Sequence, residues 1–172
     1  MSRPTLAPAN GSVPFPAPVR RMDRTLAGPD ATAALAARLA AMARPGDLIL
    51  LAGELGAGKT HFARAFLAAR AGAPLEVPSP SFTLVQIYDL PGAGVAHVDL
   101  YRIRDSAELA ELGLDDAFES MIVLVEWPDR LGSVLPKDRL EIAFNFAAGP
   151  EERRVRLDGY GAWASRLAEA LA

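Results

Sequence analysis

Residues 47–60 read DLILLAGELGAGKT, a short apolar run followed by a glycine-rich loop that ends in Gly58-Lys59-Thr60. The run from Asp47 to Ala52 has the pattern of a buried β-strand. The apolar positions that follow Thr60 suit a helix with one packed face. Strand, loop and helix together predict a phosphate-binding loop, because glycines let successive N–H groups point at an anion and the helix N-terminus adds positive potential. These flanking elements favour that interpretation over a turn with an incidental Gly-Lys-Thr.

Each residue type in the loop has a separate chemical role. Lys59 is expected to reach the β- and γ-phosphates of a nucleotide, and the Thr60 hydroxyl is expected to bind Mg2+. Lys59 is one of only two lysines among 18 basic residues, so the chain keeps a compact ammonium where a planar guanidinium would fit poorly among backbone N–H groups. The backbone of the remaining loop residues is expected to surround the phosphates: Glu54, Leu55, Gly56, Ala57 and Gly58.

Composition limits the class of protein. A chain of 172 residues with 51% hydrophobic content is long enough for one well-buried domain. The net charge of −3 argues against a protein that grips nucleic acid by itself through a broad basic face. No apolar stretch reaches the length of about 18 residues that a membrane span needs, and there is no cysteine. We therefore expect a soluble cytoplasmic protein without membrane contact.

The N-terminal region differs from the rest of the chain. Residues 1–24 hold prolines at positions 4, 8, 14, 16 and 18 and show no hydrophobic periodicity, which predicts a disordered tail. The arginines at 20, 21 and 24 leave an organelle-targeting role open. Residues 25–172 are then expected to form a single domain.

The pattern along that domain predicts an α/β protein: a three-layer fold like that of P-loop NTPases, with a mixed central sheet of a parallel core plus antiparallel hairpins. The uniformly apolar run at 121–125 is expected beside the strand at 47–52. Hairpins are expected from strands 82–89 with 95–99 and from strands 139–146 with 152–157. Helices are expected at 29–42, 60–71, 106–112 (with Ser106 as N-cap) and 115–118, with a closing helix that buries Trp163, Leu167 and Leu171.

Two acids are placed to serve bound phosphates. Glu126 follows an apolar buried strand, so its carboxylate should emerge at the C-terminal edge of the sheet, where α/β sites lie. Asp99 also follows an apolar stretch. Hydrolysis needs such an acid to organise Mg2+ or the attacking water. From position alone, either residue qualifies.

Other polar residues carry weaker signals. Thr83 is a candidate nucleotide-sensing hydroxyl on a switch-like segment, with an exposed strand threonine as the alternative. His61 and His97 have no companions at metal-ligand spacing, so no metal is assigned to either. The basic run 153–156 is interpreted as a solvated edge strand. Arg102 and Arg104 are interpreted as members of surface ion pairs, with contact to the γ-phosphate or to a partner as the alternative.

Four separated motifs resemble the TsaE (YjeE) family in order and approximate spacing, over about residues 25–155. They are the loop at 53–60, Ser79-Pro80-Ser81-Phe82-Thr83-Leu84, His97-Val98-Asp99-Leu100-Tyr101-Arg102 and Val125-Glu126-Trp127-Pro128. The resemblance implies a bacterial ATPase that works with TsaB and TsaD, and touches tRNA only through that complex. The complex makes threonylcarbamoyladenosine beside the anticodon of tRNAs that read codons starting with A. ATP hydrolysis would reset or drive the complex.

The resemblance also implies residue roles. Thr60 and Glu126 would be the Mg2+ ligands, Lys59 the phosphate lysine, and Asp99 the acid needed for hydrolysis. Thr83 would lie in a switch-like segment and Trp127 beside the nucleotide. The chain departs from the family pattern in its proline-rich extension and in Ser81, where threonine is common.

Three other functions share part of this pattern. A small-molecule kinase would need an arginine-bearing lid, and no compact arginine-rich segment follows the loop helix. A guanine-specific switch would carry Asn-Lys-x-Asp, yet neither Asn10 nor Asn145 precedes a lysine. An ATP-sensing assembly factor with little hydrolysis overlaps with the ATPase and stays open.

Overall fold

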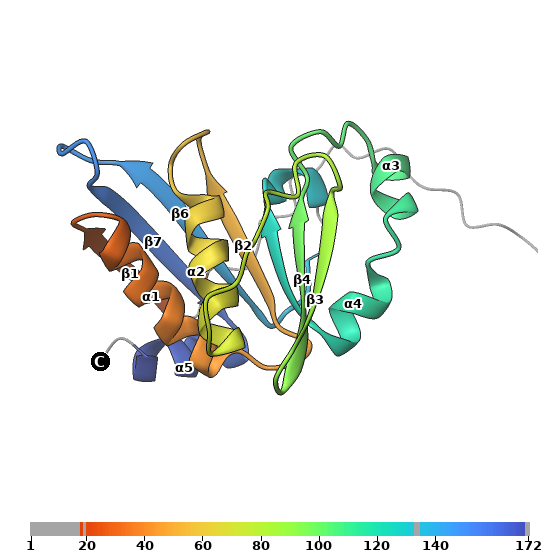
Figure 1. Ribbon diagram of the computed structural model, residues 1–172, viewed down its shortest axis with the longest axis horizontal. Coiled ribbons are helices and arrows are strands. Elements are labelled where there is room, and N and C mark those ends of the chain that lie inside the picture. Colours follow the sequence, from red (N-terminus) through yellow and green to blue (C-terminus); the bar gives the residue numbers. More distant parts are fainter. Residues whose placement is uncertain (1–17, 19, 133–134, 171–172) are drawn as a thin grey trace, which may run out of the picture.

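The computed structural model describes residues 18, 20–132 and 135–170, which contain one seven-stranded sheet with helices on its faces (Figure 1). The order across the sheet is β1-β7-β6-β2-β5-β4-β3. The strands are β1 (Arg20–Leu26), β2 (Leu48–Gly53), β3 (Val85–Leu90), β4 (Ala93–Asp99), β5 (Ile122–Glu126), β6 (Arg139–Phe146) and β7 (Arg153–Tyr160). The helices are α1 (Pro29–Met42), α2 (Lys59–Ala71), α3 (Ser106–Glu111), α4 (Asp115–Ser120), the 3-10 helix η1 (Pro128–Leu131) and α5 (Ala162–Ala170).

The sheet is mixed, as the sequence predicted. β2 runs parallel to β5 and to β6, and β4 runs parallel to β5. Antiparallel pairs β3–β4, β6–β7 and β1–β7 complete the two sides of this parallel core. The fold class, the two hairpins and the position of β5 beside β2 are therefore confirmed. The parallel arrangement brings the C-terminal ends of β2, β4 and β5 to one edge.

Helices cover the two faces unequally. In Figure 1, α1 and α2 lie in front of the sheet, α5 lies below them, and α3 and α4 lie to the right beside β3 and β4. Phe62, Phe66 and Trp163 are fully buried in the core beneath α1, α2 and α5. A second core, on the other face, packs Val98, Val123 and neighbouring residues against α3 and α4. The parallel strands are thus buried on both sides, which is why β5 reads as a continuous apolar run.

Two predictions about the ends of the domain were wrong. The tail was expected to reach residue 24, but Arg20–Arg24 belong to β1, which pairs with β7 along its whole length. Residues 1–17 and 19 lie outside the described residues, as does Leu171 of the closing helix. β7 was expected at an edge, yet it lies between β1 and β6, and its Val155 is fully buried. The alternating basic residues therefore belong to an interior strand that has one solvent-exposed face.

The segment before β3 also differs from the expectation. β3 begins at Val85, and residues 80–83 form a turn in which Leu84 N–H donates to Pro80 O. Leu84 has a φ of 64°, which is incompatible with a continuing strand. Two prolines that fix their own φ, at 78 and 80, precede this turn. Thr83 therefore lies in the turn and not on a strand.

A buried ion pair joins α5 to the start of β2. Arg166 donates from Nη1 and Nη2 to the two carboxylate oxygens of Asp47, at 2.6 and 2.7 Å, and also from Nη1 to Met42 O at 3.0 Å. Its guanidinium lies over the ring of Trp163. Both partners are less than 10% exposed. Asp47 accepts a further bond from Arg44 N–H, so one carboxylate ties three segments together.

The N-cap of α3 is Asp105 and not Ser106, the residue expected from the sequence. Asp105 Oδ1 accepts hydrogen bonds from Ala107 N–H and Glu108 N–H, both at 2.9 Å.

We expect Asp105→Ala to lower the free energy of unfolding by about 1 kcal/mol, because two N–H groups at the helix start lose their acceptor. Ser106→Ala is expected to change it by less than about 0.5 kcal/mol. Urea unfolding of the two variants checks this assignment, and the reverse order would contradict it.

Among the described residues, no helix is both long and apolar enough to cross a membrane.

Candidate functional site

The phosphate loop predicted from the sequence connects β2 to α2 at the edge where the parallel strands end. Gly56 and Gly58 have φ values of 80° and 113°, a region that residues with a Cβ rarely adopt. Gly53 lies so close to β6 that a Cβ there would meet Phe144 O at 2.6 Å. The three glycines therefore let the loop curl tightly against the sheet and begin α2 at Lys59.

Lys59 is held inside the loop that it completes. Its Nζ donates to Gly53 O at 2.6 Å and to Glu54 O at 2.8 Å, and it lies 4.1 Å from the ring centroid of Trp127. The residue is only 4% exposed. Burial lowers the pKa of Lys59, and the negative charges of Glu126 and Asp99 oppose that shift. The ammonium is thus a positive charge with little solvent around it, aimed into the loop.

Glu126 joins the loop helix to the centre of the sheet. It ends β5, is 2% exposed, and accepts a hydrogen bond from Thr60 Oγ1 on Oε2 at 2.9 Å. Its other oxygen, Oε1, lies 2.8 Å from His97 Nε2. The oxygens of a hydroxyl and of a carboxylate are hard ligands of the kind that Mg2+ prefers, and here the two lie close together. The pair expected to bind metal is thus brought together, from positions 66 residues apart.

Asp99 is fixed through both of its oxygens. Oδ1 accepts from Tyr101 N–H at 2.9 Å, and Oδ2 accepts from the Ser81 hydroxyl at 3.0 Å. Asp99 is paired in register with Glu126 across β4 and β5 and is 4% exposed. The two acids therefore lie side by side at one sheet edge, the edge predicted for Glu126.

Trp127 turns back over the loop. It has a φ of 61°, which ends β5 and directs the indole onto Lys59. The ring of Tyr101 lies 4.9 Å from the Trp127 ring. These two rings form an apolar wall beside the charged groups.

The groups described above surround one cavity of about 350 Å3. Of the residues expected in the site, Thr83, Glu54 and Ala57 do not line it. Glu54 contributes its carbonyl to Lys59 instead, Ala57 is buried beneath the loop, and Thr83 is exposed in the turn. The lining consists of Leu55, Gly56, Gly58, Lys59, Thr60, His61, Ser79, Ser81, Asp99, Tyr101, Glu126 and Trp127.

Sequence reasoning missed several contributors. Arg153 donates from Nε to Ala57 O at 3.1 Å, so a residue of β7 supports the loop from the far side. The sequence offered only its place in a basic run, which gave no reason to link it to the loop. His97 lacked neighbours at metal-ligand spacing, but its signal was its position two residues before Asp99 on the same strand. Ser81 stands where threonine is common in the family, and sequence reasoning assigned it no role, yet its hydroxyl donates directly to Asp99.

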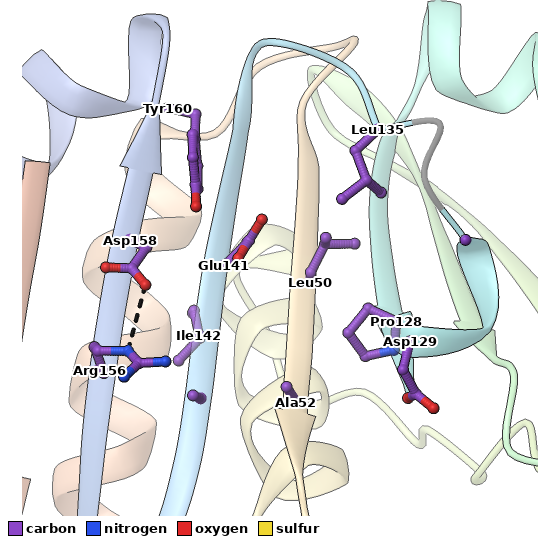
Figure 2. Close-up of a pocket in the computed structure, with 12 residues that line it drawn as sticks. Leu50, Ala52, Pro128, Asp129, Leu135, Glu141, Ile142, Arg156, Asp158 and Tyr160 are labelled. Carbon is purple, nitrogen blue, oxygen red and sulfur yellow. Dashed lines mark ion pairs between the residues drawn. The ribbon is translucent and has the colours of Figure 1, made fainter. Parts of the chain in front are cut away.

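A second cavity, of about 550 Å3, lies on the sheet face away from α1 and α2 (Figure 2). Leu50 and Ala52 line its floor, and Tyr160 stands at one end. Its charged lining comprises three carboxylates and Arg156, which is paired with Asp158 at 3.3 Å. Although this cavity is the larger of the two, the excess of carboxylates opposes phosphate, and none of the residues expected in the site lines it.

The chain is similar to known proteins over most of its length. Residues 26–155 match the family model described as threonylcarbamoyl adenosine biosynthesis protein TsaE. A protein of Bacillus subtilis named tRNA threonylcarbamoyladenosine biosynthesis protein TsaE is 39% identical over 144 residues, covering 83% of this chain and 89% of that protein. One of the same name from Streptomyces coelicolor is 37% identical, covering 80% and 97% respectively. The crystal structure of Bacillus subtilis YdiB superposes with a TM-score of 0.73 at 32% identity, covering 88% of this chain and 94% of that one.

Proposed function

This chain belongs to the TsaE family of tRNA threonylcarbamoyladenosine biosynthesis, and from that premise we propose that it binds and hydrolyses ATP with Mg2+ to support the modification. The observation that carries the proposal is the convergence of Lys59, Thr60, Asp99 and Glu126 on one cavity. We further propose that it acts in the cytoplasm with TsaB and TsaD, and meets tRNA only through them.

The residues present fit a Mg2+–nucleotide complex. The Thr60 hydroxyl and a carboxylate oxygen of Glu126 are 2.9 Å apart, and Lys59 supplies a buried positive charge beside glycine backbone that can approach phosphates closely. Bound there, Mg2+ would neutralise charge on the phosphate oxygens. Thr60 and Glu126 would hold the metal, and Lys59 would exchange its carbonyl partners for phosphate oxygens.

We propose that Asp99 is the acid that orients the attacking water. Hydrogen bonds from Tyr101 N–H and the Ser81 hydroxyl fix the orientation of its carboxylate. An oriented carboxylate beside bound phosphates can accept a hydrogen bond from a water molecule and align it for attack. Because that water must also be shielded and positioned, a site open at the surface is expected to turn over slowly until a partner covers it.

Two alternative functions predict different products. A small-molecule kinase would transfer phosphate to an acceptor without partners. An ATP-sensing assembly factor would bind ATP and release little phosphate.

We expect ATP turnover to be slow for the protein alone and to rise when TsaB and TsaD from the same source are added. Release of inorganic phosphate, measured with each protein alone and in every combination, tests this. Asp99→Ala and Glu126→Ala are the controls, because loss of the stimulated turnover in both assigns it to this site. Unchanged turnover in these variants, or turnover that partners never raise, would contradict the proposal.

A further inference from the structure

We infer that His97 is a positioning residue that fixes Glu126 for Mg2+ binding, an inference that rests on the proposed function. His97 Nε2 lies 2.8 Å from Glu126 Oε1, and the histidine is fully buried on β4, the strand next to β5. Neither the sequence pattern nor the family match assigns this residue a role. Its side chain lies on the same sheet face as Asp99 and Glu126, since it is two residues before Asp99 on β4.

The hydrogen bond has a definite direction. A carboxylate only accepts hydrogen bonds, so the hydrogen must lie on Nε2 of His97. The other ring nitrogen, Nδ1, is buried and has no hydrogen-bond partner among the described residues. The arrangement fits a ring that serves as a single donor to Glu126.

Because of this hydrogen bond, the two carboxylate oxygens of Glu126 have different partners. Oε1 of Glu126 is bound inward to His97, and Oε2 faces the Thr60 hydroxyl at 2.9 Å. With one oxygen held by His97, rotation of the carboxylate is restrained, which favours the position of the other oxygen beside Thr60. Groups that hydrogen-bond a metal-binding carboxylate typically change metal affinity by about 10- to 100-fold when they are removed.

The residue at position 97 has two informative polar replacements. The amide nitrogen of glutamine can occupy the place of Nε2 and keep a donor toward Glu126. The side chain of asparagine is shorter, and its amide nitrogen matches the place of Nδ1. The hydrogen-bond donor toward Glu126 is therefore lost, although the side chain stays polar. His97→Leu removes both nitrogens.

The test measures the Mg2+ concentration that gives half of the metal-dependent rise in melting temperature at saturating ATP, with ATP in EDTA as the baseline. For His97→Leu and His97→Asn we expect this midpoint to rise by about tenfold or more, while ATP affinity in EDTA is unchanged. His97→Gln is expected to stay near the wild-type midpoint. If the leucine variant does not fold, the asparagine and glutamine pair carries the comparison.

Val95→Ala is the matched control, because Val95 is also fully buried on β4 and lies on the same face without touching Glu126. It is expected to lower the melting temperature but leave the Mg2+ midpoint in place. Equal midpoints for wild type, His97→Asn and His97→Leu would overturn this inference alone, as would an equal rise in Val95→Ala. A wild-type protein without any Mg2+-dependent shift would overturn the proposed function, and this inference with it.

Discussion

Replacing Lys59 with alanine is expected to abolish the rise in melting temperature that Mg2+ with ATP gives the wild-type protein. A ligand that binds only the folded state stabilises it by about 2.7 kcal/mol at 100 times its Kd. For a chain of this size, that corresponds to a rise of about 5–10 °C. Lys59→Ala should show a rise near zero, because the buried ammonium at the centre of the loop is lost together with its charge. Differential scanning fluorimetry with and without nucleotide measures both values.

The chain offers a matched control for this prediction in its other lysine. Lys137 is exposed and does not line the cavity, so Lys137→Ala should keep the full nucleotide-dependent rise. Each variant is compared with its own melting temperature without nucleotide, since burial of Lys59 also affects the empty protein. Equal stabilisation of wild type and Lys59→Ala would contradict the assignment of this loop as the phosphate site.

The largest loss of stability is expected from breaking the buried pair of Arg166 and Asp47. Arg166→Met leaves a carboxylate that is 5% exposed without its cation. Removing one partner of such a pair typically costs about 3–5 kcal/mol. The melting temperature should fall by about 6–20 °C, because each kcal/mol corresponds to a few degrees in a chain of this size. Chemical denaturation of wild type and variant measures the free energy directly.

Two further variants separate the buried charge from other causes. The double variant Asp47→Leu with Arg166→Met should be less destabilised than the sum of the single variants, because no charge is left unpaired. The double variant should still be less stable than the wild-type protein, because Arg44 N–H also loses its acceptor, the Asp47 carboxylate. Arg21→Met removes an ion pair whose arginine is 52% exposed, and should destabilise the protein far less than Arg166→Met because solvent screens the exposed charge. A loss from Arg166→Met as small as that from Arg21→Met would contradict the importance given to the buried pair.

Local signals in the sequence predicted the elements that carry the site. The loop at 53–60, the apolar runs of β2 and β5 and the two hairpins each depend on residues close together in the chain, and the structure confirms them. Errors arose where a strand depends on a distant partner. β1 has weak hydrophobic patterning and exists because β7 supplies its hydrogen bonds from more than a hundred residues away. The same pairing made β7 an interior strand.

The sequence by itself determined that a phosphate loop follows a buried strand, and that Asp99 and Glu126 each end an apolar strand; the parallel pairing of β4 with β5 brings the two acids to one sheet edge. Periodicity, glycine positions and strand ends report backbone conformation, which is set locally. Only the tertiary structure decided which side chains meet: Glu126 between Thr60 and His97, Ser81 on Asp99, and Arg153 beneath the loop. The order of strands across the sheet fixes those contacts, and that order depends on hydrogen bonds between residues far apart in the chain.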